Sequence, residues 1–282
     1  MTLGETSLAE LRREIDAIDD SLHDLLMRRG DVQAQVGRAK AGDGVYIRPG
    51  REALVLRRLI ARHEGAFPKA ALVRIWREIF AAGLSLQGAF SVAVPASAGG
   101  TVKTLAVEHF GALTPTHELA DPAAVLAAVR EGEAAVGVLP MPAPGEGDPW
   151  WRRLARDANG PPVIARLPFA APASRAGEAE ALAVGAAPAE DTGDDRSLLT
   201  LEAAGEASDA EISTAVTDAG VEPVAWLTAP ADNGGGRLHL VETPGLVTDA
   251  DARLETLAGT AAVADARVLG SYAVPLTAAE LA

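Results

Sequence analysis

Apolar residues in the first forty positions recur at alternating intervals of three and four, the spacing of a helical seam that packs against another helix. Ser7 and Glu10 match the capping box of a helix start, and Gly42 and Gly44 indicate the end. The pattern therefore predicts one long helix over residues 8–40. Its seam positions are Leu8, Leu11, Ile15, Ile18, Leu22, Leu25, Val32, Val36 and Ala39.

Arg29 occupies a position on that seam. A buried guanidinium without an anionic partner incurs a desolvation cost of several kcal/mol, and arginine keeps its proton. Lys40 follows after close to three helical turns and returns to nearly the same azimuth. Arg12 lies near the other end of the helix, so it could serve the same site only from a second copy of the chain. We predict an anion site at Arg29 and Lys40; the alternative is that Arg29 extends to solvent.

Two shorter helices are predicted next. Pro49 suits the first turn of a helix over residues 49–64, and Pro68 opens a third helix that continues past Gly83. Gln87 falls on the apolar face of the third helix, where its amide needs a partner from ligand or backbone. The first helix is far longer than the other two and would project beyond them. A dimer in which two long helices pair would cover the projecting part and would also bring Arg12 to the site of the neighbouring chain.

Residues after 91 are rich in Ala, Gly and Pro with short apolar runs. They predict strands at 91–95 and 135–140 and helices at 102–110 and 123–130, which is a β/α layer pattern. Adjacent Trp150 and Trp151 are expected to cover an exposed apolar patch, with a binding site as the alternative.

Composition limits the class of protein. Hydrophobic residues make up 48% and charged residues 23% of 282 residues, as in globular proteins, and the lack of cysteine excludes disulfides and thiolate metal sites. The net charge is -14, yet residues 1–91 hold 14 Lys and Arg against 12 Asp and Glu. Nucleic acid is therefore an unexpected partner. We expect no membrane span and a cytoplasmic protein, since neither a leader pattern nor a spanning run occurs.

Five segments together resemble the all-helical class of chorismate mutases over residues 7–90. They are Leu-Arg-Arg-Glu-Ile-Asp-Ala-Ile-Asp (11–19), Leu-Leu-Met-Arg-Arg (25–29), Val-Gly-Arg-Ala-Lys (36–40), Pro-Gly-Arg-Glu (49–52) and Leu-Ser-Leu-Gln (84–87). The resemblance implies an intertwined homodimer with shared active sites. It also implies conversion of chorismate to prephenate by an intramolecular Claisen rearrangement, without a cofactor or metal.

The resemblance also implies roles for individual residues. Cations would bind the two carboxylates of chorismate, Lys40 and Gln87 would donate hydrogen bonds to the ether oxygen, and Glu52 would hold the ring hydroxyl. Two positions depart from the family: Arg48 stands where relatives often have an acid, and Gly83 where some have serine, which affects substrate affinity more than chemistry. The expected substrate-binding residues are Arg12, Arg29, Lys40, Arg48, Arg51, Glu52, Gly83 and Gln87, of which Arg29, Lys40, Glu52 and Gln87 are expected to be catalytic.

The remainder resembles an eroded prephenate dehydratase followed by an ACT regulatory domain. Gly-Val-Leu-Pro-Met-Pro-Ala (137–143) stands where that family has Pro-Ile-Glu-Asn, and Ala179, Glu180 and Ala181 stand where it has Thr-Arg-Phe. Only about forty residues separate these positions, too few for the second dehydratase lobe. Residues 198–274 follow a β-α-β-β-α-β order, but the phenylalanine-binding motif is replaced at 227–230.

We therefore expect an α+β multidomain chain: a helical mutase domain (1–91), a degenerate dehydratase-like α/β domain (92–195) and an ACT-like domain (196–282). The expected function is chorismate mutase in phenylalanine and tyrosine biosynthesis, with a non-catalytic C-terminal region that is structural or regulatory. An unidentified effector of that region is left open. The alternatives are a bifunctional mutase and dehydratase, and a binding module that senses a dicarboxylate.

Overall fold

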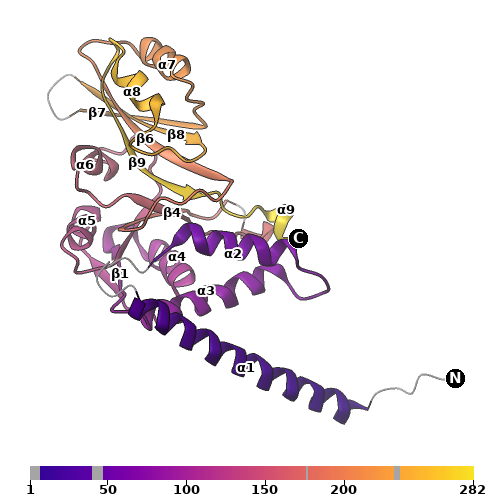
Figure 1. Ribbon diagram of the computed structural model, residues 1–282. Helices are drawn as coiled ribbons and strands as arrows, with labels where there is room; N and C mark the ends of the chain where they lie inside the picture. The colour runs from indigo at the N-terminus through magenta and orange to yellow at the C-terminus, as the bar shows by residue number, and fades with distance from the viewer. Residues whose placement is uncertain (1–6, 40–46, 176, 232–235) are drawn as a thin grey trace.

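Three helices precede a large mixed sheet (Figure 1). The computed structural model describes residues 7–39, 47–175, 177–231 and 236–282. The helices are α1 (Leu8–Ala39), α2 (Pro49–Ala61) and α3 (Lys69–Ser85), as the periodicity predicts. The expected end of α1 at Gly42 and Gly44 lies outside the described residues. None of the described helices is both long enough and apolar enough to cross a bilayer.

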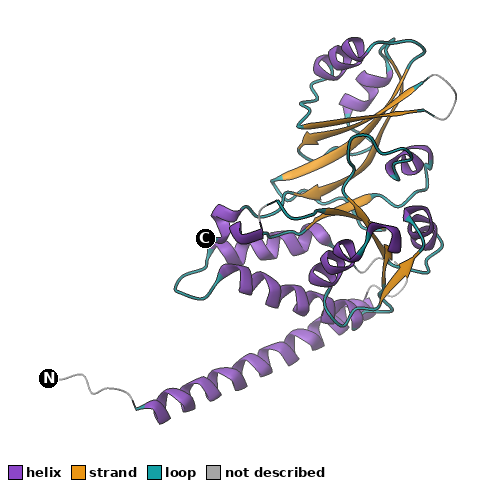
Figure 2. Cartoon of the chain, turned by 180° about the vertical axis from the view of Figure 1, so that it is seen from behind, coloured by secondary structure: helices purple, strands orange, loops and turns teal. Residues whose placement is uncertain are grey.

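Helix α1 extends away from the rest of the chain and contacts it only near its C-terminal end, beside α3 (Figures 1 and 2). Its seam is exposed within one chain: relative exposure is 64% at Leu8, 56% at Ile15 and 54% at Leu22. A contiguous apolar stripe of this kind is typical of a surface that another protein covers.

Helices α2 and α3 share a hydrophobic core with the C-terminal part of the chain. Leu56, Val73 and Phe80 pack with Phe169 and Leu276 in one buried cluster. A short helix, α9 (Ala278–Leu281), closes this cluster, and Lys69 on α3 donates to its carbonyl oxygens. The helical part is therefore joined to the rest by packing as well as by the chain.

Nine strands form one sheet in the order β2-β1-β3-β5-β4-β9-β6-β8-β7. In its first half, β1 runs parallel to β2 and β3, whereas β5 is antiparallel to β3 and β4. Helix α4 packs on one face, and α5 and α6 pack on the other. The elements are β1 (Val92–Pro95), α4 (Gly100–Phe110), β2 (Thr116–Leu119), α5 (Pro122–Arg130), β3 (Val136–Pro140), α6 (Trp151–Arg156), β4 (Val163–Leu167) and β5 (Ala181–Gly185).

The second half has the predicted β-α-β-β-α-β order. Its strands lie in the order β9-β6-β8-β7 with antiparallel pairing, and α7 and α8 cover one face. Strand β9 meets β4 of the first half at Gly270 and Val163, where a Cβ on Gly270 would lie 2.1 Å from the Val163 carbonyl oxygen. The elements are β6 (Asp195–Ala203), α7 (Asp209–Asp218), β7 (Ala225–Pro230), β8 (Arg237–Pro244), α8 (Ala252–Ala258) and β9 (Val263–Ala273).

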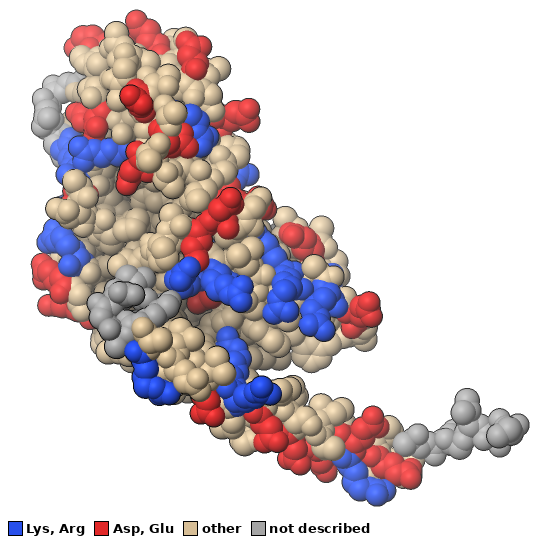
Figure 3. Space-filling model, in the orientation of Figure 1, with Lys and Arg blue, Asp and Glu red and all other residues tan. Residues whose placement is uncertain are grey.

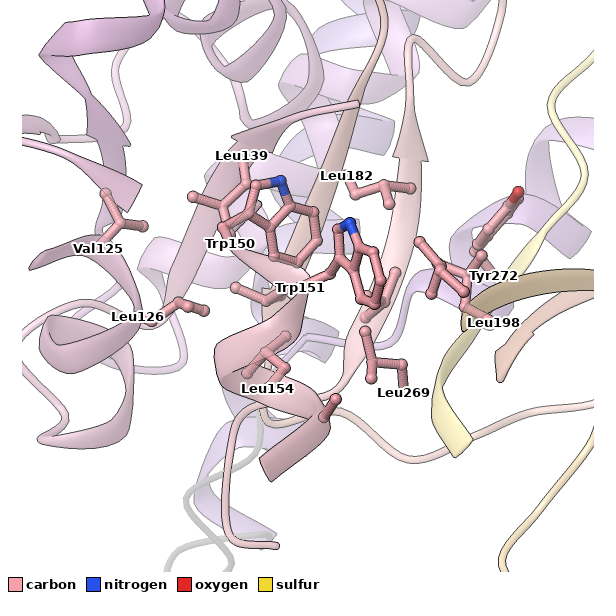
Figure 4. Packing of buried hydrophobic residues seen from close by; sticks show 14 of the residues in the cluster. Val125, Leu126, Leu139, Trp150, Trp151, Leu154, Leu182, Leu198, Leu269 and Tyr272 are labelled. Carbon is pink, nitrogen blue, oxygen red and sulfur yellow. The ribbon is translucent and has the colours of Figure 1, made fainter. Parts of the chain in front are cut away.

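Trp150 and Trp151 are core residues, and the expectation that they cover an exposed patch is wrong. Their exposures are 3% and 1%. Figure 4 shows both indoles among Leu139, Leu182 and other apolar side chains. The Trp150 indole nitrogen donates to the Pro140 carbonyl oxygen at 2.9 Å. Large aromatic surfaces fill the space between the two halves of the sheet, which sequence periodicity does not reveal.

Candidate active site

A cavity of about 360 Å³ lies where the C-terminal end of α1 meets α2 and α3. Five of the residues expected in the site line it: Arg29, Arg48, Arg51, Glu52 and Gln87. Lys and Arg side chains gather over α2 and the adjoining part of α1, whereas acidic side chains follow the outer part of α1 (Figure 3). Helix α1 and the start of α2 thus bring cations from distant sequence positions to one place.

Arg29 is half-buried and held by its neighbours, so it does not extend freely to solvent. Its guanidinium donates to Gln33 Oε1 at 2.5 Å and lies 5.7 Å from the centre of the Phe80 ring. Burial lowers the pKa of Arg29, against the opposing effect of the Glu52 carboxylate, but arginine stays protonated at any ordinary pH. The side chain is a fixed cation on the cavity wall.

Glu52 forms a buried ion pair with Arg77 of α3. Arg77 Nη1 and Glu52 Oε2 are 2.8 Å apart, and the two side chains are 6% and 13% exposed. Burial raises the pKa of Glu52, while the charges of Arg77 and then Arg29 oppose that rise. The second oxygen of Glu52 makes no hydrogen bond within the part of the chain that the structure describes, so it is available to a ligand.

Arg77 was not among the residues predicted for the site, although the sequence contains a signal for it. It lies four residues after Val73 and three before Phe80, on the buried stripe of α3. An arginine at an apolar position is the same signal that identified Arg29.

Gln87 and Gly83 lie together at the end of α3. The amide nitrogen of Gln87 donates to the Gly83 carbonyl oxygen at 2.9 Å, and Gly37 of α1 packs against the Gln87 side chain. A Cβ on Gly83 would lie 1.8 Å from the amide nitrogen of Gln33. The absence of a side chain at Gly83 therefore makes room for Gln33, which was also not predicted as a site residue.

Arg48 is bound by a carboxylate from the C-terminal region. Glu190 forms an ion pair with the Arg48 guanidinium, which raises the pKa of Arg48, and it accepts a hydrogen bond from the Arg51 backbone N–H at 3.2 Å. A Cβ on Gly50 would lie 2.7 Å from the Glu190 Cβ, so the close approach depends on glycine. Arg48, which stands where related mutases often have an acid, is therefore paired with an acid 142 positions later in the chain.

Of the expected site residues that the structure describes, Arg12 and Gly83 do not line this cavity. Arg12 lies on the exposed outer part of α1 and is not on the cavity wall. Lys40 lies outside the described residues, so its position is not defined.

Among the described residues, the polar side chains considered for dehydratase chemistry already have partners within the protein. Glu180 is paired with Arg166 at 2.7 Å. The Thr192 hydroxyl is hydrogen-bonded to Asp195 Oδ1 at 2.7 Å, and the fully buried Ser197 hydroxyl donates to the Gly245 carbonyl oxygen at 2.9 Å. Both hydroxyl groups have structural partners.

Comparison with known proteins finds a family match for the helical segment. Residues 11–88 match the family model of chorismate mutase type II. The bifunctional chorismate mutase/prephenate dehydratase of Pseudomonas aeruginosa is 30% identical over 149 residues, which are 51% of this chain and 41% of the relative. The bifunctional chorismate mutase/prephenate dehydratase of Aquifex aeolicus is 33% identical over 142 residues, which are 48% of this chain and 38% of the relative. The matches therefore span about two fifths of the length of these relatives.

Solved structures that align with the chain include two prephenate dehydratases. The protein from Streptococcus mutans has 13% identity and a TM-score of 0.49, with coverage of 66% of this chain and 100% of that chain. The one from Arthrobacter aurescens, in complex with L-Phe, has 15% identity and a TM-score of 0.47, with coverage of 67% and 91%.

Proposed function

Because residues 11–88 match the family model of chorismate mutase type II, we propose that the chain converts chorismate to prephenate, a step in aromatic amino acid biosynthesis. One observation carries the proposal: Arg29 of α1, Arg51 and Glu52 of α2, and Gln87 just after α3 line one cavity within the matched segment. A unimolecular rearrangement needs neither a nucleophile nor a base. It needs a site that holds one compact conformer and stabilises developing charge.

The contacts around the cavity support electrostatic preorganisation. Gln33 and Phe80 hold the Arg29 guanidinium, and Arg77 holds one oxygen of Glu52. The cations suit the two carboxylates of chorismate, and Glu52 would accept a hydrogen bond from the ring hydroxyl. Gln87 uses one of its two amide hydrogens on the backbone and would donate the other to the ether oxygen, together with Lys40.

The direct test is to follow loss of chorismate and formation of prephenate with the purified full-length chain. Saturable turnover above the uncatalysed rate is expected. Tight binding of chorismate without turnover would instead establish the alternative, a module that senses a dicarboxylate.

We also propose that two copies pair along α1 and share their active sites. The exposed seam of α1 needs a partner, and an antiparallel second α1 would bring its Arg12 toward the cavity that contains Arg29. The large exposed apolar residues of α1 are Leu8, Leu11, Ile15, Ile18, Leu22, Leu25, Leu26, Met27, Val32 and Val36.

Complementation tests the shared site. Chains with Arg12→Ala or Arg29→Gln should each lose most activity, but their mixture should recover about a quarter of it, since half of the dimers are mixed and one site in each is complete. As a control, Arg29→Gln mixed with the double variant Arg12→Ala/Arg29→Gln should recover none. Equal activities of the two mixtures, or a monomer in sedimentation, would rule out sharing.

Glu190 is expected to weaken substrate binding. Its carboxylate occupies Arg48 and the first turn of α2, both of which face the substrate cavity. Glu190→Gln should therefore lower KM for chorismate by roughly fivefold, on the scale of one partly exposed ion pair, and leave kcat unchanged. Asp191→Asn, which removes a neighbouring charge, is the matched control. A raised KM would mean that Glu190 positions Arg48 and does not compete with substrate.

For the C-terminal region we propose a structural or regulatory role without dehydratase activity, although the relatives are named as bifunctional. Dehydration requires a proton donor for the departing hydroxyl, and Ala179 has none. Thr192 and Ser197 are engaged in internal hydrogen bonds, and Glu180 would repel a dianionic substrate. Incubation with prephenate at neutral pH should yield phenylpyruvate only at the spontaneous rate; faster production that Thr192→Val or Ser197→Ala abolishes would reverse this assignment.

We further propose three units, at 1–91, 92–195 and 196–282. The first boundary falls between α3 and β1, and the second at the start of β6. The second and third units share one sheet through β4 and β9.

A further inference from the structure

A second cavity, of about 270 Å³, lies between the N-terminal half of α3, α4 and residues 168–175. Its walls are largely apolar and include Val73, Leu105 and Phe169, while Arg74, Arg77 and His109 add polar groups. At the packing density of protein interiors, this volume holds a ligand of roughly a dozen non-hydrogen atoms. None of the residues expected in the mutase site lines it.

His109 is the first sign of a ligand. It is 7% exposed, it lines the cavity, and its imidazole makes no hydrogen bond within the described residues. Burial, together with the charge of Arg77, holds the pKa of His109 well below its usual value, so the ring is neutral at pH 7. A neutral imidazole has one donor and one acceptor, and buried polar groups of this kind are normally satisfied. A polar group bound in the cavity would satisfy it.

The charges around the cavity favour a single negative charge. Arg77 is paired with Glu52, and Arg175 with Glu108 at 2.8 Å, so these cations are already balanced. Arg74 is exposed and lines the cavity, and it has no ion pair among residues that the structure describes. One unbalanced cation beside apolar walls suits a monoanion with an apolar body.

We propose that this cavity binds a small monocarboxylate with an apolar body, whose carboxylate meets Arg74 and whose polar atoms satisfy His109. Arg77 separates the cavity from the mutase site: its guanidinium lies 5.2 Å from the centre of the Phe169 ring and also holds Glu52 Oε2. A ligand against Arg77 alters the field at Glu52. Occupancy of the cavity therefore changes the KM for chorismate. This consequence rests on the proposed mutase function, whereas binding of the monocarboxylate is independent of that function.

Calorimetric titration of the full-length chain with 3-phenylpropanoate, and with uncharged 3-phenylpropanamide as its matched probe, tests the site. The acid should bind at least tenfold more tightly than the amide. Arg74→Gln should reduce that preference by about twofold to fivefold, the range for one exposed ion pair, and Ala71→Leu should block both probes by filling the cavity. Arg62→Gln, an exposed arginine on neither cavity wall, should change nothing.

Binding to the mutase cavity is the main confounding outcome. If Arg29→Gln abolishes binding of the acid while Arg74→Gln and Ala71→Leu leave it intact, the probe occupies the mutase cavity and the proposal is overturned. Equal binding of the acid and the amide would also overturn it. Binding at the proposed site without any change in the KM for chorismate would refute the coupling through Arg77, and an inactive chain that still binds the acid would refute the mutase assignment instead.

Discussion

Replacement of Arg29 with glutamine is expected to reduce kcat/KM for chorismate by roughly 150-fold, or about 3 kcal/mol, the scale for removal of one partner from a desolvated charge pair. Arg29 is half-buried and held by Gln33 and Phe80, so its charge acts at short range and with little screening by solvent. Glutamine keeps a hydrogen-bond donor on a shorter side chain without the charge, and the loss therefore reports the charge and the reach of the guanidinium together.

Arg28→Gln is the matched control, because Arg28 is the preceding residue of α1 and is exposed. It should retain activity within about twofold, as expected for a screened surface charge. Steady-state kinetics of both variants, with circular dichroism to establish that they are folded, provide the comparison. Equal effects of the two substitutions would exclude Arg29 from the site.

Replacement of Arg77 with methionine is expected to lower the free energy of unfolding by about 3 to 5 kcal/mol, because it leaves the buried Glu52 carboxylate without its nearest counter-charge. The double variant Arg77→Met/Glu52→Gln should recover most of the loss, since neither residue then carries a buried charge. Arg74→Met, one turn earlier on the exposed face of α3, should be nearly neutral. Urea unfolding of the three variants measures these differences.

The pH dependence of the Arg77→Met variant follows from the raised pKa of Glu52. Loss of Arg77 removes the positive charge that does most to lower the pKa of Glu52 against the effect of burial. The pKa of Glu52 therefore rises further. A carboxyl whose folded pKa exceeds its unfolded value stabilises the fold below the unfolded value and loses that contribution as the pH rises through the folded value. The loss caused by Arg77→Met should thus be largest at neutral pH and shrink toward pH 4.5, the ordinary value for glutamate. A loss independent of pH would mean that Glu52 is not charged in the fold.

Local patterns in the sequence determined the helices and much of the sheet. Residues close together in the chain set the apolar seam of α1, the start of α2 at its proline and the β-α-β-β-α-β order. Neither β2 nor β4 was predicted: β2 is a short, partly polar edge strand (Thr116–Leu119), whereas β4 (Val163–Leu167) follows Asn159-Gly160-Pro161-Pro162, a turn signal that marks its start in the sequence. The position of Arg29 on an apolar seam likewise indicated an anion site, whereas Arg51 was expected only from the resemblance to the chorismate mutases.

Tertiary structure alone decided how these parts meet. Arg77 reaches Glu52 across 25 positions and Glu190 reaches Arg48 across 142, and no periodic pattern links residues that far apart. Burial of Trp150 and Trp151 depends on side chains of β6 and β9 that pack with α6. The core shared by α2, α3 and Phe169 likewise joins segments that lie far apart in the chain. The physical reason is that periodicity reports which face of an element is apolar. The surface that covers the face, and the charge that meets a buried arginine, depend on packing between distant segments.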